Sequence, residues 1–392
     1  MIKKIDVKTL ILFIFLFINV TAFAISINAN TIYVEEIPIS TTSIQLSFGF
    51  LCIILSLTFI TLIYNISYRL FHTDNLDLPW KKSNFIGYFL LGIQILFLIF
   101  NNLYHVNTAG SITNINEIPV IYRYFFVIFN PDILFILYAC SAKNKKILLS
   151  NTSIYIISTI SRGWSGGILF VLLIMLIRRN KISYASLFFI FIGLLFLSPY
   201  LISIKWYFRD PSLSFYNALY SVDYISSLHS SLQYIISRLQ QLTNVTFIVQ
   251  NIDYFSLQYI DGHITPYWAE NFLIKNIYSL YHPDSITLGH ALSEKLVGNP
   301  VAWNSNPGLA GWMTILLSIS IYQFILFFMI LIITIFILIY LASQLHDHNT
   351  INFIYVFSLL FLFPGWMGMY FNLIIYLFLW VTLTSFSKKW FF

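Results

Sequence analysis

Long runs of isoleucine, leucine, phenylalanine and valine fill most of the chain, and short polar segments separate them. The apolar positions are continuous rather than alternating, which predicts membrane-spanning α-helices and not the strands of a β-barrel. A helical span needs about 20 mostly apolar residues. We expect ten spans: Thr9–Ile27, Thr42–Tyr64, Phe85–Tyr104, Val120–Cys140, Ile147–Ser161, Trp164–Ile177, Ile182–Ile202, Met313–Leu341, Ile351–Trp366 and Met369–Phe386. The fifth, sixth and ninth are short, so they could thin the bilayer or be broken helices.

One long segment, residues 204–311, interrupts this pattern because it is polar, basic and rich in aromatic side chains. It divides the chain into a seven-span part, residues 1–203, the segment itself, and a three-span part, residues 312–392. Within the segment, apolar residues recur every three or four positions, which predicts one amphipathic helix between Ile225 and Leu242. Such a helix would lie on the outer surface of the bundle or among lipid headgroups.

Composition supports the same fold class. The 392 residues are 58% hydrophobic and only 9% charged, whereas soluble domains carry roughly 25% charged residues. So little charge cannot cover a water-facing surface, and we predict an all-α polytopic integral membrane protein. The net charge of +6 is not a nucleic-acid signature, because most basic residues sit in short clusters between apolar runs, where they set orientation.

The distribution of basic residues predicts the orientation. Of the 21 lysines and arginines, 14 lie at the termini or in short loops on one side, and 7 lie on the other, five of these in residues 204–311. The positive-inside rule therefore places both termini in the cytoplasm and the large loop outside. The first apolar run has the outline of a signal peptide, but it is long enough to be retained as a first span.

Arginines near the outer membrane face are the first candidates for chemistry. Arg162 lies in a glycine-rich turn between two short spans, and Arg238 lies on the expected loop helix. Arg209 and Arg123 also fall on the outer side. A guanidinium there can bind a phosphate or diphosphate through two hydrogen bonds, and it can equally be an interfacial anchor that reaches toward water. Together the four could form a basic pocket near the headgroups.

A general base would have to come from the histidines or acids of the loop. His290, with Glu294 one turn further along, is the candidate pair for the catalytic site. Other loop acids could serve instead: Asp223, Asp253, Asp261, Glu270 and Asp284. The sequence shows no phosphate-binding glycine loop, nucleophile elbow or metal-ligand spacing, so we expect neither a cofactor nor a metal.

Asp132 is the one ionisable residue predicted near the middle of the membrane, directly after Asn130 and Pro131. A carboxylate at this depth must be paired, protonated or turned to a cavity. A proton relay and a structural hydrogen bond at a proline kink both remain open at this stage.

The whole layout resembles the O-antigen polymerases of the Wzy type, and more distantly the O-antigen ligases. The resemblance covers the number of spans, the cytoplasmic ends, the late outer loop and two short elements, Ser161-Arg162-Gly163 and Ile236-Ser237-Arg238-Leu239. The ligases usually carry a histidine followed by asparagine in this loop, and the sequence contains no such pair there, which weakens the ligase alternative.

The resemblance implies a bacterial inner-membrane enzyme that joins oligosaccharide repeat units carried on undecaprenyl diphosphate. The growing glycan would pass from its lipid diphosphate to a sugar hydroxyl of the next unit. Arg162 and Arg238 would hold the diphosphate with Arg209 assisting, and a loop histidine or carboxylate would be the base. Its partners would be the lipid-linked oligosaccharide and membrane lipid, and not nucleic acid, while the binding of a chain-length regulator stays open. A ligase, another lipid-linked glycosyltransferase, or a repeat-unit flippase are the alternatives.

Overall fold

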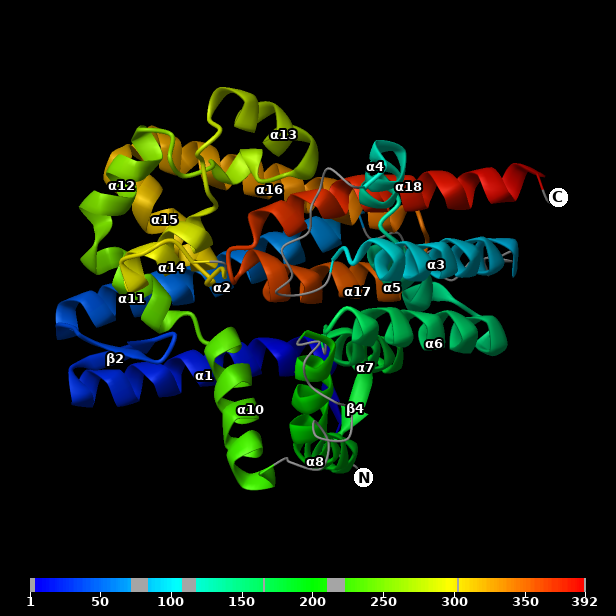
Figure 1. Cartoon of the computed structure of the whole chain (residues 1–392), viewed down its shortest axis with the longest axis horizontal. Coiled ribbons are helices and arrows are strands. Elements are labelled where there is room, and N and C mark those ends of the chain that lie inside the picture. Colours follow the sequence, from blue (N-terminus) through cyan, green and yellow to red (C-terminus); the bar gives the residue numbers. More distant parts are fainter. Residues whose placement is uncertain are drawn as a thin grey trace.

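The structure is a computed structural model that describes residues 4–71, 84–107, 118–164, 166–209, 223–301 and 303–390. It is predominantly helical (Figure 1). In this part of the chain, seven helical segments are long and apolar enough to cross a membrane. They are α1 (Val7–Ala29), α2 (Ser43–Phe71), α3 (Asn84–Tyr104), α4 (Val120–Ile128) with α5 (Pro131–Ser141), α8 (Tyr184–Arg209), α16 (Ile321–Ser343) and α18 (Met367–Trp390). The protein is therefore a helical membrane protein.

Three further predicted spans correspond to shorter helices. These are α6 (Lys145–Ser161), α7 (Gly166–Arg179) and α17 (His348–Phe357), which continues into a π-helical turn, η3 (Ser358–Leu362). Within the described residues, seven helical segments are long and apolar enough to cross a membrane, and these three are shorter. The total of ten spans therefore stays a prediction.

Two predicted spans are divided in the structure. The fourth breaks between α4 and α5, because Pro131 begins the second helix and Asn130 caps it. The eighth breaks at Ser320, whose side chain caps the start of α16, so that Gly308–Ile319 forms a separate helix, α15. The expected amphipathic helix corresponds to α10 (Tyr224–Leu239), and Leu242 instead begins α11 (Leu242–Gln250).

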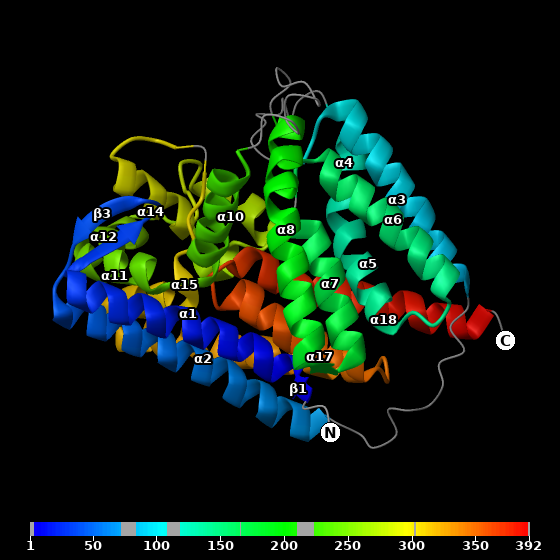
Figure 2. The same ribbon diagram turned by 90° about the horizontal axis from the view of Figure 1, so that it is seen from below.

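Two small antiparallel sheets join segments that the hydrophobic pattern did not predict as strands. β1 (Lys4–Asp6) pairs with β4 (Lys181–Ser183), which brings two basic segments to the same end of the bundle. β2 (Thr31–Val34) and β3 (Ile37–Ser40) form a hairpin between α1 and α2. In Figure 2 this hairpin lies beside α11 and α12 (Ile252–Ile260), which belong to the long polar segment.

The described part of the long segment folds onto the bundle rather than standing apart from it. Its remaining helices are η2 (Tyr267–Ala269), α13 (Phe272–Tyr281) and α14 (Leu288–Val297). One hydrophobic cluster contains Ile53 of α2, Val245 of α11 and Trp312 of α15, all fully buried. α8 and α10 pack on each other at one side of the molecule (Figures 1 and 2).

Candidate functional site

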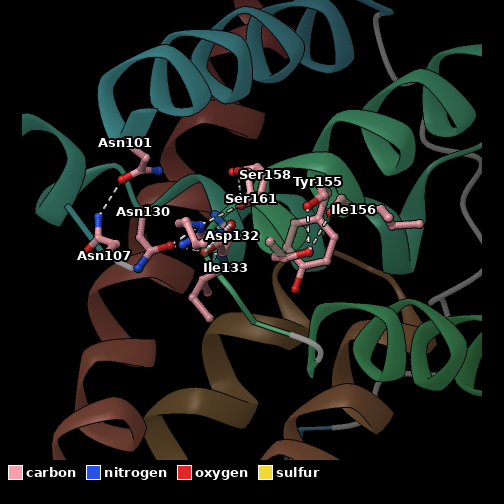
Figure 3. A network of polar contacts seen from close by, with 11 residues as sticks. Asn101, Asn107, Asn130, Asp132, Ile133, Tyr155, Ile156, Ser158 and Ser161 are labelled. Atoms are coloured by element: carbon pink, nitrogen blue, oxygen red, sulfur yellow. Dashed lines mark hydrogen bonds and ion pairs between the residues drawn. The ribbon is translucent and has the colours of Figure 1, made fainter. Parts of the chain in front are cut away.

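Arg162 forms an ion pair with Asp132. Figure 3 shows Asp132 within a network of polar contacts that includes Asn130 and Ser158. One terminal nitrogen of Arg162, Nη2, donates to both carboxylate oxygens, at 3.0 and 2.8 Å, and Nε donates to the Ser158 carbonyl at 2.9 Å. The guanidinium also lies 5.1 Å from the centre of the Phe97 ring. Arg162 is only 2% exposed, so Asp132 and its other neighbours enclose the charge expected to meet a diphosphate.

The break between α4 and α5 places Asp132 for this contact. The Asn130 side-chain oxygen accepts hydrogen bonds from the backbone N–H groups of Asp132 and Ile133, at 3.1 and 3.3 Å. Asp132 thus lies in the first turn of α5, where the helix dipole favours a negative charge. The sequence left open a proton relay and a structural hydrogen bond at a proline kink. The structure shows a partner for the second, because Asp132 pairs with Arg162 beside Pro131.

The other predicted arginines do not join this ion pair. Arg238 lies near the end of α10, half-buried, with its guanidinium 5.3 Å from the centre of the Tyr234 ring. Arg123 is half-buried on α4, 5.5 Å from the centre of the Tyr124 ring. Arg209 is the last residue of α8, and its side chain lies outside the described part of the structure.

A pocket of about 210 Å³ opens where the long segment meets the connection between α17 and α18. Its lining residues come from four separate stretches of the chain. They are Glu270, Thr287, Gly289, Asn304, Ser305, Pro307, Gly365, Trp366, Gly368, Met369 and Asn372. The pocket thus combines a carboxylate, an indole and several amides and hydroxyls, which are groups that recognise the hydroxyls and apolar faces of sugars.

Glu270 supplies the carboxylate of the pocket. Its Oε2 accepts a hydrogen bond from the Gly368 backbone N–H at 3.2 Å. Burial raises the pKa of Glu270 to about 8, and the Gly368 hydrogen bond and the charge of Lys275 oppose this shift. A carboxylate with a pKa near neutral pH can exchange a proton with a substrate hydroxyl under working conditions.

Close backbone contacts hold two walls of the pocket together. A side chain at Gly368 would place its Cβ 2.6 Å from the Glu270 carbonyl oxygen, so only glycine fits there. Gly308 and Gly365 both have positive φ, and the Gly308 N–H donates to the Pro364 carbonyl at 3.0 Å. The start of α15 and the α17–α18 turn are therefore fixed to each other.

Asn306 connects the pocket to Arg238. Its Oδ1 accepts a hydrogen bond from Trp366 Nε1 at 2.6 Å, and its Nδ2 donates to the Arg238 carbonyl at 3.4 Å. The nearby Asn304 Oδ1 is buried and accepts no hydrogen bond from any described residue. A hydroxyl donor in the pocket would satisfy it.

The structure brings together the two residues predicted as the catalytic pair. His290 Nε2 lies 3.7 Å from Glu294 Oε1, one turn apart on α14, and both side chains are about 30% exposed. His290 follows Gly289, which lines the pocket, but neither His290 nor Glu294 is a lining residue. Their position makes them alternatives to Glu270 rather than its neighbours in the pocket.

Tyr376 of α18 contacts both the segment that carries Glu270 and the helix α4 that precedes Asp132. Its ring stacks on Phe272, two residues after Glu270, with ring centres 6.4 Å apart. Its hydroxyl donates to the Val127 carbonyl, at 3.1 Å, just before the break that positions Asp132. Tyr376 thus links the start of α13, next to Glu270, to the end of α4.

Sequence reasoning named Glu270 only as one of several loop acids and missed Asn306, Trp366 and Asn372. The polar run Asn304–Gly308, directly before an apolar helix, was the available signal for one wall of the pocket. No family model, no curated protein and no solved structure matches the chain.

Proposed function

We propose that the protein is a membrane glycosyltransferase that polymerises lipid-linked oligosaccharide repeat units. The observation that carries this proposal is the Glu270 pocket: a proton-accepting group beside an indole and unsatisfied amide oxygen, built against membrane-spanning helices. The resemblance of the chain's layout to O-antigen polymerases supports the substrate class, undecaprenyl-diphosphate-linked repeat units of an O-antigen or capsule.

In this proposal Glu270 is the general base. An acceptor sugar hydroxyl in the pocket gives its proton to the Glu270 carboxylate while its oxygen forms a bond to the anomeric carbon of the growing glycan. The bond from that carbon to the diphosphate oxygen breaks, and the lipid diphosphate leaves with the electron pair. Negative charge develops on this leaving group, so nearby cations stabilise the transition state.

Arg238 and Lys275 are the cations that we assign to the diphosphate. The main-chain carbonyl of Arg238 accepts a hydrogen bond from Asn306 beside the pocket wall, and Lys275 is close enough to lower the pKa of Glu270. Arg162 is held by Asp132, so we assign it a positioning role, acting through the α4–α5 break and Tyr376. Arg123 and Arg209 remain further candidates for the diphosphate.

The same proposal sets the location of the reaction. The charge distribution favours cytoplasmic termini in a bacterial inner membrane, which puts the pocket on the periplasmic side. The segments before α2, before α15 and before α18 should then share that side. In agreement, Ser305 Oγ donates to Glu35 in the β2–β3 hairpin at 2.8 Å, and the Gly308 N–H donates to Pro364.

Electrophoresis of the cell-surface polysaccharide tests the proposal in cells that lack the chromosomal copy of the gene. The wild-type chain should restore a ladder of many repeat units, whereas Glu270→Gln and Arg238→Ala should leave a single repeat at equal membrane abundance. Glu294→Gln is the matched control for Glu270→Gln. Arg179→Ala, at the far end of α7, is the matched control for Arg238→Ala. A full ladder from Glu270→Gln with a single repeat from Glu294→Gln would move the base to α14.

The same gel separates the alternatives. Loss of a ligase would remove the glycan from lipid A altogether, and loss of a flippase would prevent even the first repeat from reaching the outer side. A single repeat in the null strain is therefore the pattern expected for a polymerase. Either of the other patterns would contradict the proposal.

A further inference from the structure

The helix that follows Glu270, α13, presents its apolar side away from the protein. Leu273, Ile277 and Leu280 recur at spacings of four and three residues and are 52, 61 and 79% exposed. Ile274 and Tyr281 flank them on the same side. Lys275 and Ser279 lie on the other side of the helix, and Asn276 borders the apolar side; these three polar residues are exposed as well.

Contacts to the spanning helices α16 and α18 show how far along those helices the chain around Glu270 lies. The Tyr267 ring lies 4.7 Å from that of Phe327, six residues into α16, or about 9 Å along a helix that rises about 1.5 Å per residue. The Phe272 N–H donates to Asn372 at 3.1 Å, and its ring stacks on Tyr376, nine residues into α18, or about 14 Å along it. Residues 267–272 therefore lie beside these helices rather than beyond their ends, and α13 continues from them (Figure 1).

We propose that residues 264–281 form a re-entrant segment and that the apolar side of α13 is covered by the hydrocarbon chains of the adjacent bilayer leaflet. Irregular backbone is tolerated at membrane depth only where protein covers it, and the irregular first part is buried, with Thr265 and Ala269 at 0% exposure. The exposed second part is a helix, which satisfies its own backbone. Trp268 and Tyr281, at either end, are suited to the membrane interface.

Lys275, on the opposite side of α13, is near enough to the Glu270 carboxylate for its charge to lower the pKa of that group. If the proposed function holds, the re-entrant segment places the pocket at the edge of the lipid phase. A substrate carried on a long lipid chain would then reach Glu270 sideways from the leaflet.

Site-directed spin labelling of the full chain in phospholipid nanodiscs tests this placement without any measurement of activity. Single cysteines at Ile277 and Leu280, in a chain with Cys52 and Cys140 replaced by alanine, should be relaxed by dissolved oxygen and not by a water-soluble nickel chelate. The lipid control is a label at Phe189, which is 71% exposed on α8. Labels at Ser279, on the polar side, and at the exposed Asp284 provide the aqueous comparison.

The expected oxygen-to-nickel accessibility ratios at Ile277 and Leu280 match that at Phe189 and exceed those at Ser279 and Asp284. Ratios at Ile277 and Leu280 equal to that at Asp284 would overturn the proposal, because α13 would then lie in water. Strong protection from both reagents would also overturn it, since protein rather than lipid would cover the helix. A missing polysaccharide ladder would leave these ratios unchanged, so the two proposals fail independently.

Discussion

The Glu270 carboxyl predicts how elongation should depend on pH. With its pKa at about 8, about one carboxyl in ten is ionised at pH 7, half at pH 8 and about nine in ten at pH 9. Only the ionised form can accept the proton of the acceptor hydroxyl. The rate should therefore rise about fivefold between pH 7 and 8 and less than about twofold between pH 8 and 9.

Glu270→Gln keeps the size of the side chain but removes the base. A positioned general base contributes about 10²–10⁴-fold to a rate, so the variant should lose at least about 100-fold and its residual rate should not follow this profile. The assay is the initial rate of glycan elongation by purified protein in lipid vesicles, from pH 6 to 9.5. Glu294→Gln should keep the wild-type profile.

Lys275→Met gives a second check on the same group. The lysine charge stabilises the ionised carboxylate and lowers its pKa, so its removal should raise the pKa and shift the midpoint of the profile to higher pH. A flat wild-type profile between pH 7 and 9, or a Glu270→Gln rate within about threefold of wild type, would refute the assignment of Glu270 as the base.

Two further predictions concern the supports of the site. Gly368→Ala should lower the unfolding free energy, measured by steric trapping, by about 1–3 kcal/mol, because the new Cβ would lie 2.6 Å from the Glu270 carbonyl oxygen. The control is Gly193→Ala, which has open space around its Cβ and should not lower the unfolding free energy. Equal losses from the two substitutions would contradict the close contact at Gly368. Asp132→Asn should lower the unfolding free energy by about 3–5 kcal/mol, because the buried Arg162 guanidinium cannot lose its charge. Adding Arg162→Met to the same chain should restore much of this stability. Additive losses from the two substitutions would show that the residues do not interact.

The hydrophobic pattern predicted the helical membrane fold because apolar length is a local property of the chain. Breaks within spans were harder to place, since they depend on capping: the Asn130 side chain and the Ser320 hydroxyl each begin a new helix inside a continuous apolar run. The β2–β3 hairpin was missed for a related reason. Its strands are only four residues each, so they show too little alternation to distinguish them from a loop.

The candidate site was less predictable because its parts are distant in sequence. Asp132 and Arg162 were both singled out, but their pairing depends on the packing of α5 against α6 and could not be read from spacing. Glu270 was one of several equivalent loop acids. Its burial in the folded protein, beside Gly368 almost 100 residues later, is what raises its pKa.

The most direct test of the proposed activity is a reaction with purified components. The wild-type protein in lipid vesicles receives a synthetic polyprenyl-diphosphate-linked repeat unit, and products are separated by chain length. The account predicts lipid-linked products of two, three and more repeats, with one free polyprenyl diphosphate released for each new glycosidic bond. Unchanged repeat units, whether left in place or moved across the vesicle membrane, would contradict it.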